Sequence, residues 1–302
     1  MTHQDFLSAL SKKFKIPTEE LLKSPLNKHK HALNVVYRGT RVIEKLKEYA
    51  GVESVEGLHA LDIGCGYGGV IVEFAKRGAH GTGIDLNANN LEIAKLYAKD
   101  AYDIDFYNIR ADSYRLPEVV GENKFDIVVL TSVLEHIYEL EDFAVTLDKI
   151  LKPGGYLYFH VPNHQSFHAL NREPHVGVYG VSVLSPDAWA EFDWPSAGTF
   201  HRPLELYEKY FLGHGFNKAI RIINTSAPED TKDIIRSKII ETKKILEEKK
   251  ELLSQKQFAT LSSAVHHHLD NLEVKIKTES NEYLYYRYVE YDHTVIIQKP
   301  LV

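Results

Sequence analysis

An acidic residue followed by closely spaced glycines is the part of the sequence best suited to chemistry. Asp62 stands two residues before the first glycine of a run that contains Gly64, Gly66, Gly68 and Gly69. Glycine lets the backbone bend sharply and lets a ligand approach the main chain. The apolar residues before this run predict a strand, and residues 70–75 predict a helix whose first N–H groups are unpaired. The pattern therefore predicts a cradle for a nucleotide-type ligand.

The carboxylate of Asp62 distinguishes between two kinds of ligand. The glycine spacing fits both the dinucleotide fingerprint and the simpler G-x-G-x-G pattern. A carboxylate would repel a pyrophosphate, because like charges repel at short range. It would attract an ammonium or a sulfonium group, and S-adenosylmethionine carries both. At this point the sequence resembles the class I S-adenosylmethionine-dependent methyltransferases, whose first motif is acidic-x-G-x-G-x-G.

Further motifs of this family follow in the expected order. Residues 81–86 predict a second strand ending near Asp85, which lies 19 residues after Gly66, close to the spacing at which an acid meets ribose hydroxyls. The segment Leu134-Glu135-His136 resembles small-molecule methyltransferases, including those of the ubiquinone and menaquinone pathways. The other predicted elements are a helix over 88–98, strands over 104–109, 125–130 and 156–161, and a Lys152-Pro153-Gly154-Gly155 turn before the last of them.

The resemblance covers about residues 55–225 and implies an α/β fold. This is a Rossmann-like, seven-stranded sheet in the order 3-2-1-4-5-7-6, with the last strand antiparallel and with helical additions. The predicted parts are an N-terminal helical cap over 1–50, a methyltransferase core over 51–228 with an acceptor-loop insertion at 163–202, a helical insertion over 229–280, and the final strand within 281–302.

The three additions carry separate expectations. Residues 27–49 have a helical period, and Tyr37, Arg38 and Arg41 could reach the carboxylate of the cofactor. The 163–202 insertion holds several histidines and both tryptophans, Trp189 and Trp194, and it follows strand five at the edge where ligands bind in such sheets. We interpret it as a wall of the acceptor pocket. The apolar stripe of 229–280 could form a homodimer, a lid or an intramolecular contact.

The resemblance implies roles for eight cofactor-binding residues. From the methionine end of the cofactor to its adenine, they are Asp62, Gly64, Gly66, Thr131, Asp85, Leu86, Asp112 and Ser113. The first three would bind the methionine end, and Thr131 would offer its backbone. Asp85 would hold the ribose hydroxyls and Leu86 would flank the adenine. Asp112, with Ser113 beside it, would accept from the adenine amino group.

Two histidines are candidates for acid–base chemistry, since an oxygen or nitrogen acceptor must lose a proton and histidine titrates near neutral pH. His136 follows strand four, and His201 precedes the helix over 203–213. Some relatives bind a divalent metal through E-x-x-E-H, but Ser132 stands where the first glutamate would be. We therefore predict no metal site, although the sequence leaves open whether a metal joins Glu135 and His136.

Composition limits the functional classes. The net charge of −6 argues against unspecific nucleic-acid binding, and no stretch approaches the ~20 apolar residues of a membrane span. Cys65 is the single cysteine, so no intramolecular disulfide can form, which fits a reducing compartment. The N-terminal residues lack the apolar region of a signal peptide. We expect a cytoplasmic protein that binds neither nucleic acid nor membrane.

The expected activity is methyl transfer to a hydroxyl of a small polar molecule, such as a sugar or a natural-product intermediate. N-methylation of a small molecule and a non-catalytic cofactor-binding or scaffold role are the alternatives, and a nicotinamide-dependent oxidoreductase is a more distant one. The strand-four motif of adenine and glutamine amino-methyltransferases is missing, and Cys65 lies in the cofactor turn rather than at a site for pyrimidine C5 chemistry.

Overall fold

The computed structural model describes residues 3–99, 102–175, 177–189, 191–192, 198–217, 219–222 and 226–301. The chain divides into two units that are each compact by themselves. The first unit contains Met1–His160, Glu208–Arg221 and Val295–Val302. The second unit contains Val161–Tyr207 and Ile222–Thr294.

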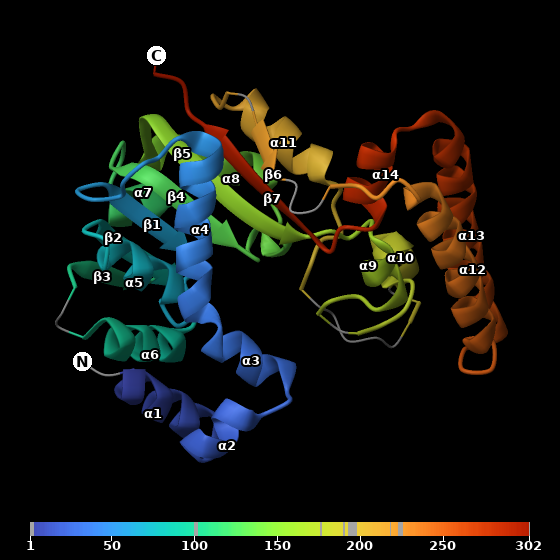
Figure 1. Cartoon of the computed structure of the whole chain (residues 1–302), viewed down its shortest axis with the longest axis horizontal. Coiled ribbons are helices and arrows are strands. Elements are labelled where there is room, and N and C mark those ends of the chain that lie inside the picture. Colours follow the sequence, from blue (N-terminus) through green and yellow to red (C-terminus); the bar gives the residue numbers. More distant parts are fainter. Residues whose placement is uncertain are drawn as a thin grey trace. The chain divides into compact units, whose positions relative to one another are not determined.

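The described residues form one seven-stranded sheet in the order β3-β2-β1-β4-β5-β7-β6, most of it in the first unit (Figure 1). The pairs β1–β2, β1–β4, β2–β3 and β4–β5 are parallel, and β7 runs antiparallel to β5. Its strands are β1 (His59–Ile63), β2 (His80–Asp85), β3 (Ile104–Asn108), β4 (Phe125–Thr131), β5 (Leu151–Pro162), β6 (Ala219–Ile222) and β7 (Asp292–Gln298). The predicted fold class and strand order are confirmed.

The fifth strand begins earlier than the sequence predicted. Its first residue is Leu151, so the Lys-Pro-Gly-Gly segment expected as a turn is part of the strand. The pairing with β4 passes from Phe125–Leu151 to Ile127–Tyr156, which leaves the extra residues in a bulge. Gly154 has a φ of 81°, and glycine adopts such a left-handed conformation without strain.

The helices of the first unit include a broken N-terminal helix. The helix predicted over 27–49 is two helices, which meet at Asn34. The elements are α1 (His3–Phe14), α2 (Thr18–Lys23), α3 (Asn27–Leu33), α4 (Val35–Ala50), α5 (Gly69–Ala75), α6 (Ala88–Ala98), α7 (Leu116–Val120), the 3₁₀ helix η2 (Leu134–His136), α8 (Leu140–Ile150) and most of α11 (Leu204–Gly213).

Helix α4 crosses α5 at a very short distance because two glycines lie at the crossing. A Cβ atom built on Gly69 would lie 2.3 Å from the carbonyl oxygen of Val35, and one built on Gly39 would lie 2.5 Å from the Cβ of Glu73. Only hydrogen fits at both positions. The crossing holds α4 directly beside the helix that follows the glycine turn.

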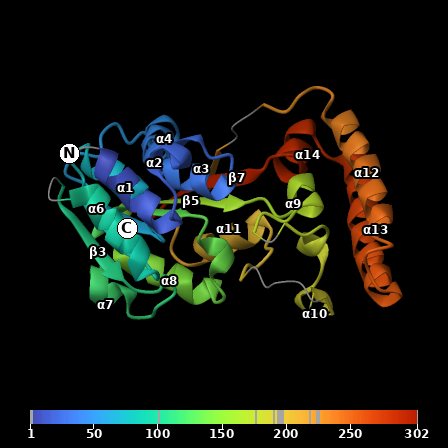
Figure 2. The same cartoon turned by 90° about the horizontal axis from the view of Figure 1, so that it is seen from below.

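The second unit is built from helices around its own core. They are α9 (Phe167–Asn171), the 3₁₀ helix η3 (Val181–Val183), α10 (Pro186–Trp189), α12 (Thr231–Glu248), α13 (Gln255–Thr278) and α14 (Asn281–Tyr288). Figures 1 and 2 show α12 and α13 running side by side. Helix α14 occupies residues for which the sequence predicted only the approach to the final strand.

The apolar stripe of the helical insertion packs inside the second unit. Ile235, Ile239 and Leu246 of α12 and Leu261 and Val265 of α13 are buried in a core shared with α9 and η3. The sequence left open a homodimer, a lid or an intramolecular contact, and the intramolecular contact accounts for these residues. A dimer through this segment would have to use other side chains.

Among the described residues, none of the helices combines the length and the apolar character needed to cross a lipid bilayer.

We expect Gly69→Ala to destabilise the protein by about 1–3 kcal/mol, because the added methyl group overlaps the Val35 carbonyl and forces α4 away from α5. Gly213→Ala is the matched control, since a Cβ there meets nothing within 4 Å and alanine favours a helix. Urea unfolding measures both changes. Equal unfolding midpoints for the two variants would contradict the assigned crossing.

Candidate active site

The glycine turn lies at the carboxyl end of β1, between β2 and β4. The backbone N–H groups of Gly64 and Cys65 donate to the carbonyl of Ile84, at 2.8 and 2.9 Å, which ties the turn to β2. Gly64 and Gly66 have φ values of 71° and 53°. A Cβ built on Gly66 would meet nothing within 4 Å, so this part of the turn faces open space.

A cavity of about 240 Å³ opens beside this turn. Four of the predicted cofactor-binding residues contribute to its wall: Asp62, Gly64, Gly66 and Thr131. Arg38 of α4 and Asn90 of α6 also line it, together with Ser132 after β4. The wall therefore combines helices α4, α5 and α6 with the glycine turn and the ends of β1 and β4. It lies at the carboxyl edge of the sheet, which is where open α/β sheets bind ligands.

Asp62 is a buried carboxylate on the wall of the cavity. Its side chain is 1% exposed, and its Oδ1 atom has no hydrogen-bond partner among the described residues. Burial raises the pKa of Asp62 from 3.8 to about 8; the charge of Asp85 acts in the same direction and Arg38 opposes it. A cationic group in the cavity would supply the missing partner and would favour the ionised carboxylate. This fits the ammonium end of the expected cofactor.

Arg38 brings a positive charge to the same cavity. Burial lowers the pKa of Arg38, whereas the charge of Asp62 raises it. Of the three residues proposed to reach the carboxylate of the cofactor, Arg38 is the one on the cavity wall. Tyr37 is 64% exposed and Arg41 is also exposed. An acid and a guanidinium on one wall match a ligand that carries both an ammonium and a carboxylate group.

Asp85, at the end of β2, holds the glycine turn in place. Its Oδ2 accepts from the backbone N–H of Gly66 at 2.9 Å, and its Oδ1 accepts from that of Asn87 at 2.7 Å. The side chain amide of Asn90 lies 3.5 Å from the same Oδ1. A carboxylate has about four acceptor positions, so these bonds leave capacity for hydroxyl groups.

The remaining predicted cofactor residues lie outside the wall of this cavity. Leu86 is 76% exposed, directly after β2. Asp112 receives two hydrogen bonds from Arg110, at 2.9 and 2.8 Å, and these hydrogen bonds lower the pKa of Asp112. The Oγ of Ser113 accepts from the backbone N–H of Arg115 at 3.3 Å. The residues assigned to the methionine end of the cofactor thus lie together on the cavity wall. Leu86, Asp112 and Ser113 do not line this cavity.

Two residues on the cavity wall, Ser132 and Asn90, were not predicted as site residues from the sequence. Ser132 has a φ of 56°, a conformation that a non-glycine residue adopts rarely and that concentrates at functional sites. Its backbone N–H donates to the carbonyl of His160 at 2.8 Å. Asn90 carried no motif signal.

Cys65 is buried, and burial raises the pKa of its thiol, which fits a small residue in a turn rather than a nucleophile.

His136 ends the 3₁₀ helix that follows β4, and its side chain is exposed. The preceding Glu135 is fully buried. The short helix therefore turns two neighbouring polar residues in different directions. His136 belongs to the first unit, whereas His201, the second catalytic candidate, belongs to the second.

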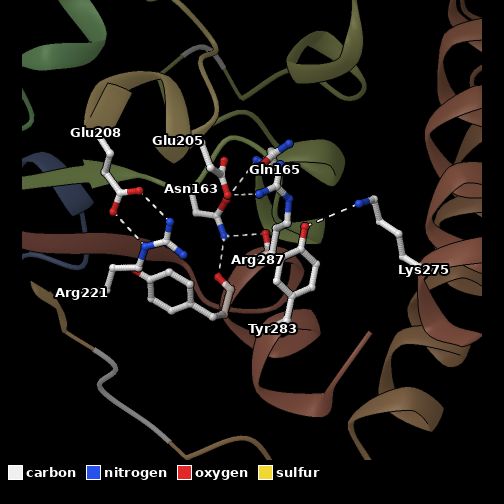
Figure 3. Close-up of polar contacts among 9 residues, drawn as sticks. Asn163, Gln165, Glu205, Glu208, Arg221, Lys275, Tyr283 and Arg287 are labelled. Atoms are coloured by element: carbon white, nitrogen blue, oxygen red, sulfur yellow. Dashed lines mark hydrogen bonds and ion pairs between the residues drawn. The ribbon is translucent and has the colours of Figure 1, made fainter. Parts of the chain in front are cut away.

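The acceptor-loop segment of the second unit is anchored by Asn163. The side chain is 2% exposed, and its amide donates to the carbonyls of Glu290 and Arg287, at 2.8 and 3.0 Å, just beyond and at the end of α14 (Figure 3). Its Oδ1 accepts from the backbone N–H of Gln165 at 3.1 Å. Arg287 also pairs with Glu205. These bonds fix the chain where it leaves β5.

His201 lies against a buried carboxylate in the second unit. Its Nε2 is 3.3 Å from the Oε1 of Glu173, which is fully buried. The indole of Trp189 stacks on the His201 ring, with 5.3 Å between ring centroids and an interplanar angle of 9°. Trp194, the other tryptophan of the segment, falls outside the described residues.

Known proteins resemble this chain around the glycine turn. A family model described as a methyltransferase domain matches residues 61–159. A ubiquinone biosynthesis O-methyltransferase from Brucella ovis is 31% identical over 172 residues, which cover 56% of this chain and 62% of that protein. One from Chelativorans sp. is 38% identical over 104 residues, which cover 34% of this chain and 40% of that protein. The chain thus spans less than two thirds of the length of these curated relatives.

Solved structures resemble this chain at low sequence identity. A methyltransferase from Archaeoglobus fulgidus described as SAM-dependent is 15% identical with a TM-score of 0.49, covering 86% of this chain and 94% of that one. Phosphoethanolamine N-methyltransferase 2 from Haemonchus contortus is 20% identical with a TM-score of 0.47, covering 86% of this chain and 52% of that one. Similarity at this level identifies no substrate.

The sheet order, the family match and the curated relatives agree. The chain contains a class I S-adenosylmethionine-dependent methyltransferase domain, with S-adenosylmethionine as its cofactor. The predicted family, fold and cofactor are confirmed.

We expect the stability of the ligand-free protein to report the raised pKa of Asp62. A carboxyl group whose pKa is higher in the folded state, at about 8, than its ordinary value of 3.8 makes folding progressively less favourable as the pH rises between these values. Asp62→Asn removes this effect. The melting temperature of the variant should match the wild type near pH 4 and exceed it increasingly towards pH 8.

Asp105→Asn serves as the control, because Asp105 is an exposed carboxylate on β3. A difference between Asp62→Asn and the wild type that stays constant across this pH range would contradict the assignment.

Proposed function

We propose that the protein transfers a methyl group from S-adenosylmethionine to a hydroxyl group of a small polar molecule, of the sugar or natural-product type. The observation that carries the proposal is the cavity beside the glycine turn, where the unpartnered oxygen of Asp62 and the guanidinium of Arg38 lie on one wall. The curated relatives from Brucella ovis and Chelativorans sp. are O-methyltransferases, which supports oxygen as the acceptor atom.

In this proposal the residues of the cavity bind and orient the methionine end of the cofactor. Asp62 pairs with the ammonium group and Arg38 with the carboxylate. Gly64 and Gly66 present their backbone without side chains in the way, and Thr131 offers its backbone at the end of β4. Bound S-adenosylmethionine would supply a methyl group on a sulfonium: the acceptor atom would bond to the methyl carbon in line as the carbon–sulfur bond breaks and S-adenosylhomocysteine leaves. Holding the reacting atoms in that geometry is worth several orders of magnitude in rate.

Asp85, Leu86, Asp112 and Ser113 are proposed for the rest of the cofactor. Asp85 accepts from the ribose hydroxyls while its existing bonds keep the glycine turn in shape. Leu86, exposed after β2, flanks the adenine. Asp112 is kept ionised by Arg110 and accepts from the adenine amino group, with Ser113 beside it.

His136 is proposed as the base that takes the proton of the acceptor hydroxyl. It is exposed, and it follows the strand that ends at Thr131 on the cavity wall. An imidazole titrates near neutral pH, which suits proton transfer under physiological conditions. His201, the second candidate for acid–base chemistry, contacts the buried carboxylate of Glu173 in the second unit.

The first test is titration calorimetry of the purified protein with S-adenosylhomocysteine, with reduced nicotinamide adenine dinucleotide as the competing ligand class. We expect S-adenosylhomocysteine to bind and the reduced dinucleotide not to bind. Asp85→Ala should weaken binding of S-adenosylhomocysteine strongly, because it removes the ribose acceptor and loosens the glycine turn. The exposed Asp105→Ala should leave it unchanged. Unchanged affinity in Asp85→Ala would remove the ribose assignment.

The second test addresses the base. With an acceptor identified by transfer of a labelled methyl group to a panel of hydroxylated small molecules, His136→Ala should lower kcat by about 10²–10⁴-fold. Affinity for S-adenosylhomocysteine should stay the same. His80→Ala is the control, because His80 lies at the amino end of β2, whereas the glycine turn lies at the carboxyl ends of the strands. Full activity of His136→Ala would exclude it as the base.

A further inference from the structure

Three side chains of the second unit converge in a way that the proposed function does not use. The ligating atoms of His164, Glu173 and His201 all lie within 4.8 Å of one another. The rings of His164 and His201 are 4.5 Å apart between centroids, and His201 Nε2 is 3.3 Å from Glu173 Oε1. All three residues belong to the acceptor-loop segment and to the second unit.

His164 is the least satisfied member of the cluster. Its side chain is 3% exposed, and neither ring nitrogen has a hydrogen-bond partner among the described residues. Buried polar atoms without partners are rare, because each one loses its hydrogen bonds to water. A neutral imidazole with an available lone pair is the form that binds metal ions.

Glu173 is held in a fixed orientation by its neighbour in the sequence. The backbone N–H of His175 donates to Oε2 at 2.7 Å, and Nδ1 of His175 lies 2.9 Å from Oε1. The carboxylate is fully buried. Partners of this kind orient the ligands of metal sites and tune their affinity.

The two histidines are also held by their surroundings. His164 follows Asn163, whose amide bonds to the chain at the end of α14 fix this turn. His201 is stacked against Trp189, which limits the rotation of its ring and shields it from water. The cluster therefore has rigid supports on each of its three members.

We propose that His164, Glu173 and His201 form a binding site for a divalent transition metal ion of the Zn²⁺ type. Two imidazoles and one carboxylate, with a fourth position left open, are a ligand set that Zn²⁺ uses. Ligands about 2.0–2.1 Å from a tetrahedral ion lie about 3.3 Å from one another, and His201 Nε2 and Glu173 Oε1 have this separation. The ion supplies the partner that His164 lacks.

The site goes beyond the proposed methyl transfer and replaces the expectation that the chain carries no metal. It assigns His201 to metal binding instead of proton transfer. Its ligands come from three places in the segment: the turn after β5, the loop after α9 and the residues before α11. One ion would therefore cross-link these three parts of the chain.

The test is binding of Zn²⁺ to untagged full-length protein after chelator treatment, followed by calorimetry and elemental analysis. We expect one tight site, and a d–d absorption band of four- or five-coordinate Co²⁺ when that ion is used as the probe. Glu173→Gln and His201→Ala should each weaken the site by at least about tenfold. Zn²⁺ should raise the melting temperature of the wild type and not that of these variants.

A second histidine group makes the control essential. His266 and His267 are exposed on α13 and could bind metal adventitiously. The double variant His266→Ala/His267→Ala should keep the tight site and its Co²⁺ spectrum. Absence of tight binding, loss of the site in this double variant, or an unchanged site in folded Glu173→Gln and His201→Ala proteins would overturn the proposal. Circular dichroism establishes that each variant is folded.

Discussion

The order of the parallel strands is the constraint on which the cofactor side of the molecule depends. Strand β1 lies between β2 and β4, so the connections leaving its neighbours run in opposite directions and open a crevice at their carboxyl ends. The glycine turn fills the floor of that crevice, and Asp85 fastens it to the end of β2. The close crossing of α4 over α5 then brings Arg38 to the same place. Sheet order, turn and helix crossing thus act on one small volume.

Within that volume, the protein keeps a carboxyl group in an environment that disfavours its charge. Asp62 has lost nearly all contact with water, and Asp85 adds a second negative charge nearby. In the absence of a ligand, the protonated form of the carboxyl group is favoured. A cationic ligand reverses this preference, so recognition and ionisation are coupled. Burial of this carboxyl group lowers the stability of the ligand-free protein. The same burial makes the site selective for positively charged groups over phosphate.

Features with a local cause could be predicted from the sequence. The glycine turn, the acid that ends β2 and the buried run of β4 each follow from turn chemistry or hydrophobic period, and the family resemblance that they carry implied the sheet order. Features that depend on distant contacts could not. Helix α14 is stabilised by packing of Leu284 and Tyr288 in the second core, the crossing at Gly39 needs α5 as its partner, and the approach of His201 to Glu173 needs two loops to fold together.

The anchoring of Asn163 has a consequence for the order in which the chain acquires structure. Its amide bonds join residues 123 to 127 positions apart, and β7 lies between β5 and β6 although it is the last strand in the sequence. During synthesis, the strands up to β5 and the glycine turn can assemble while the chain is still growing. The turn after β5 and the edge strand β6 have to wait for residues near 290. A nascent chain can therefore complete its glycine turn long before the turn after β5 gains the hydrogen bonds that anchor it.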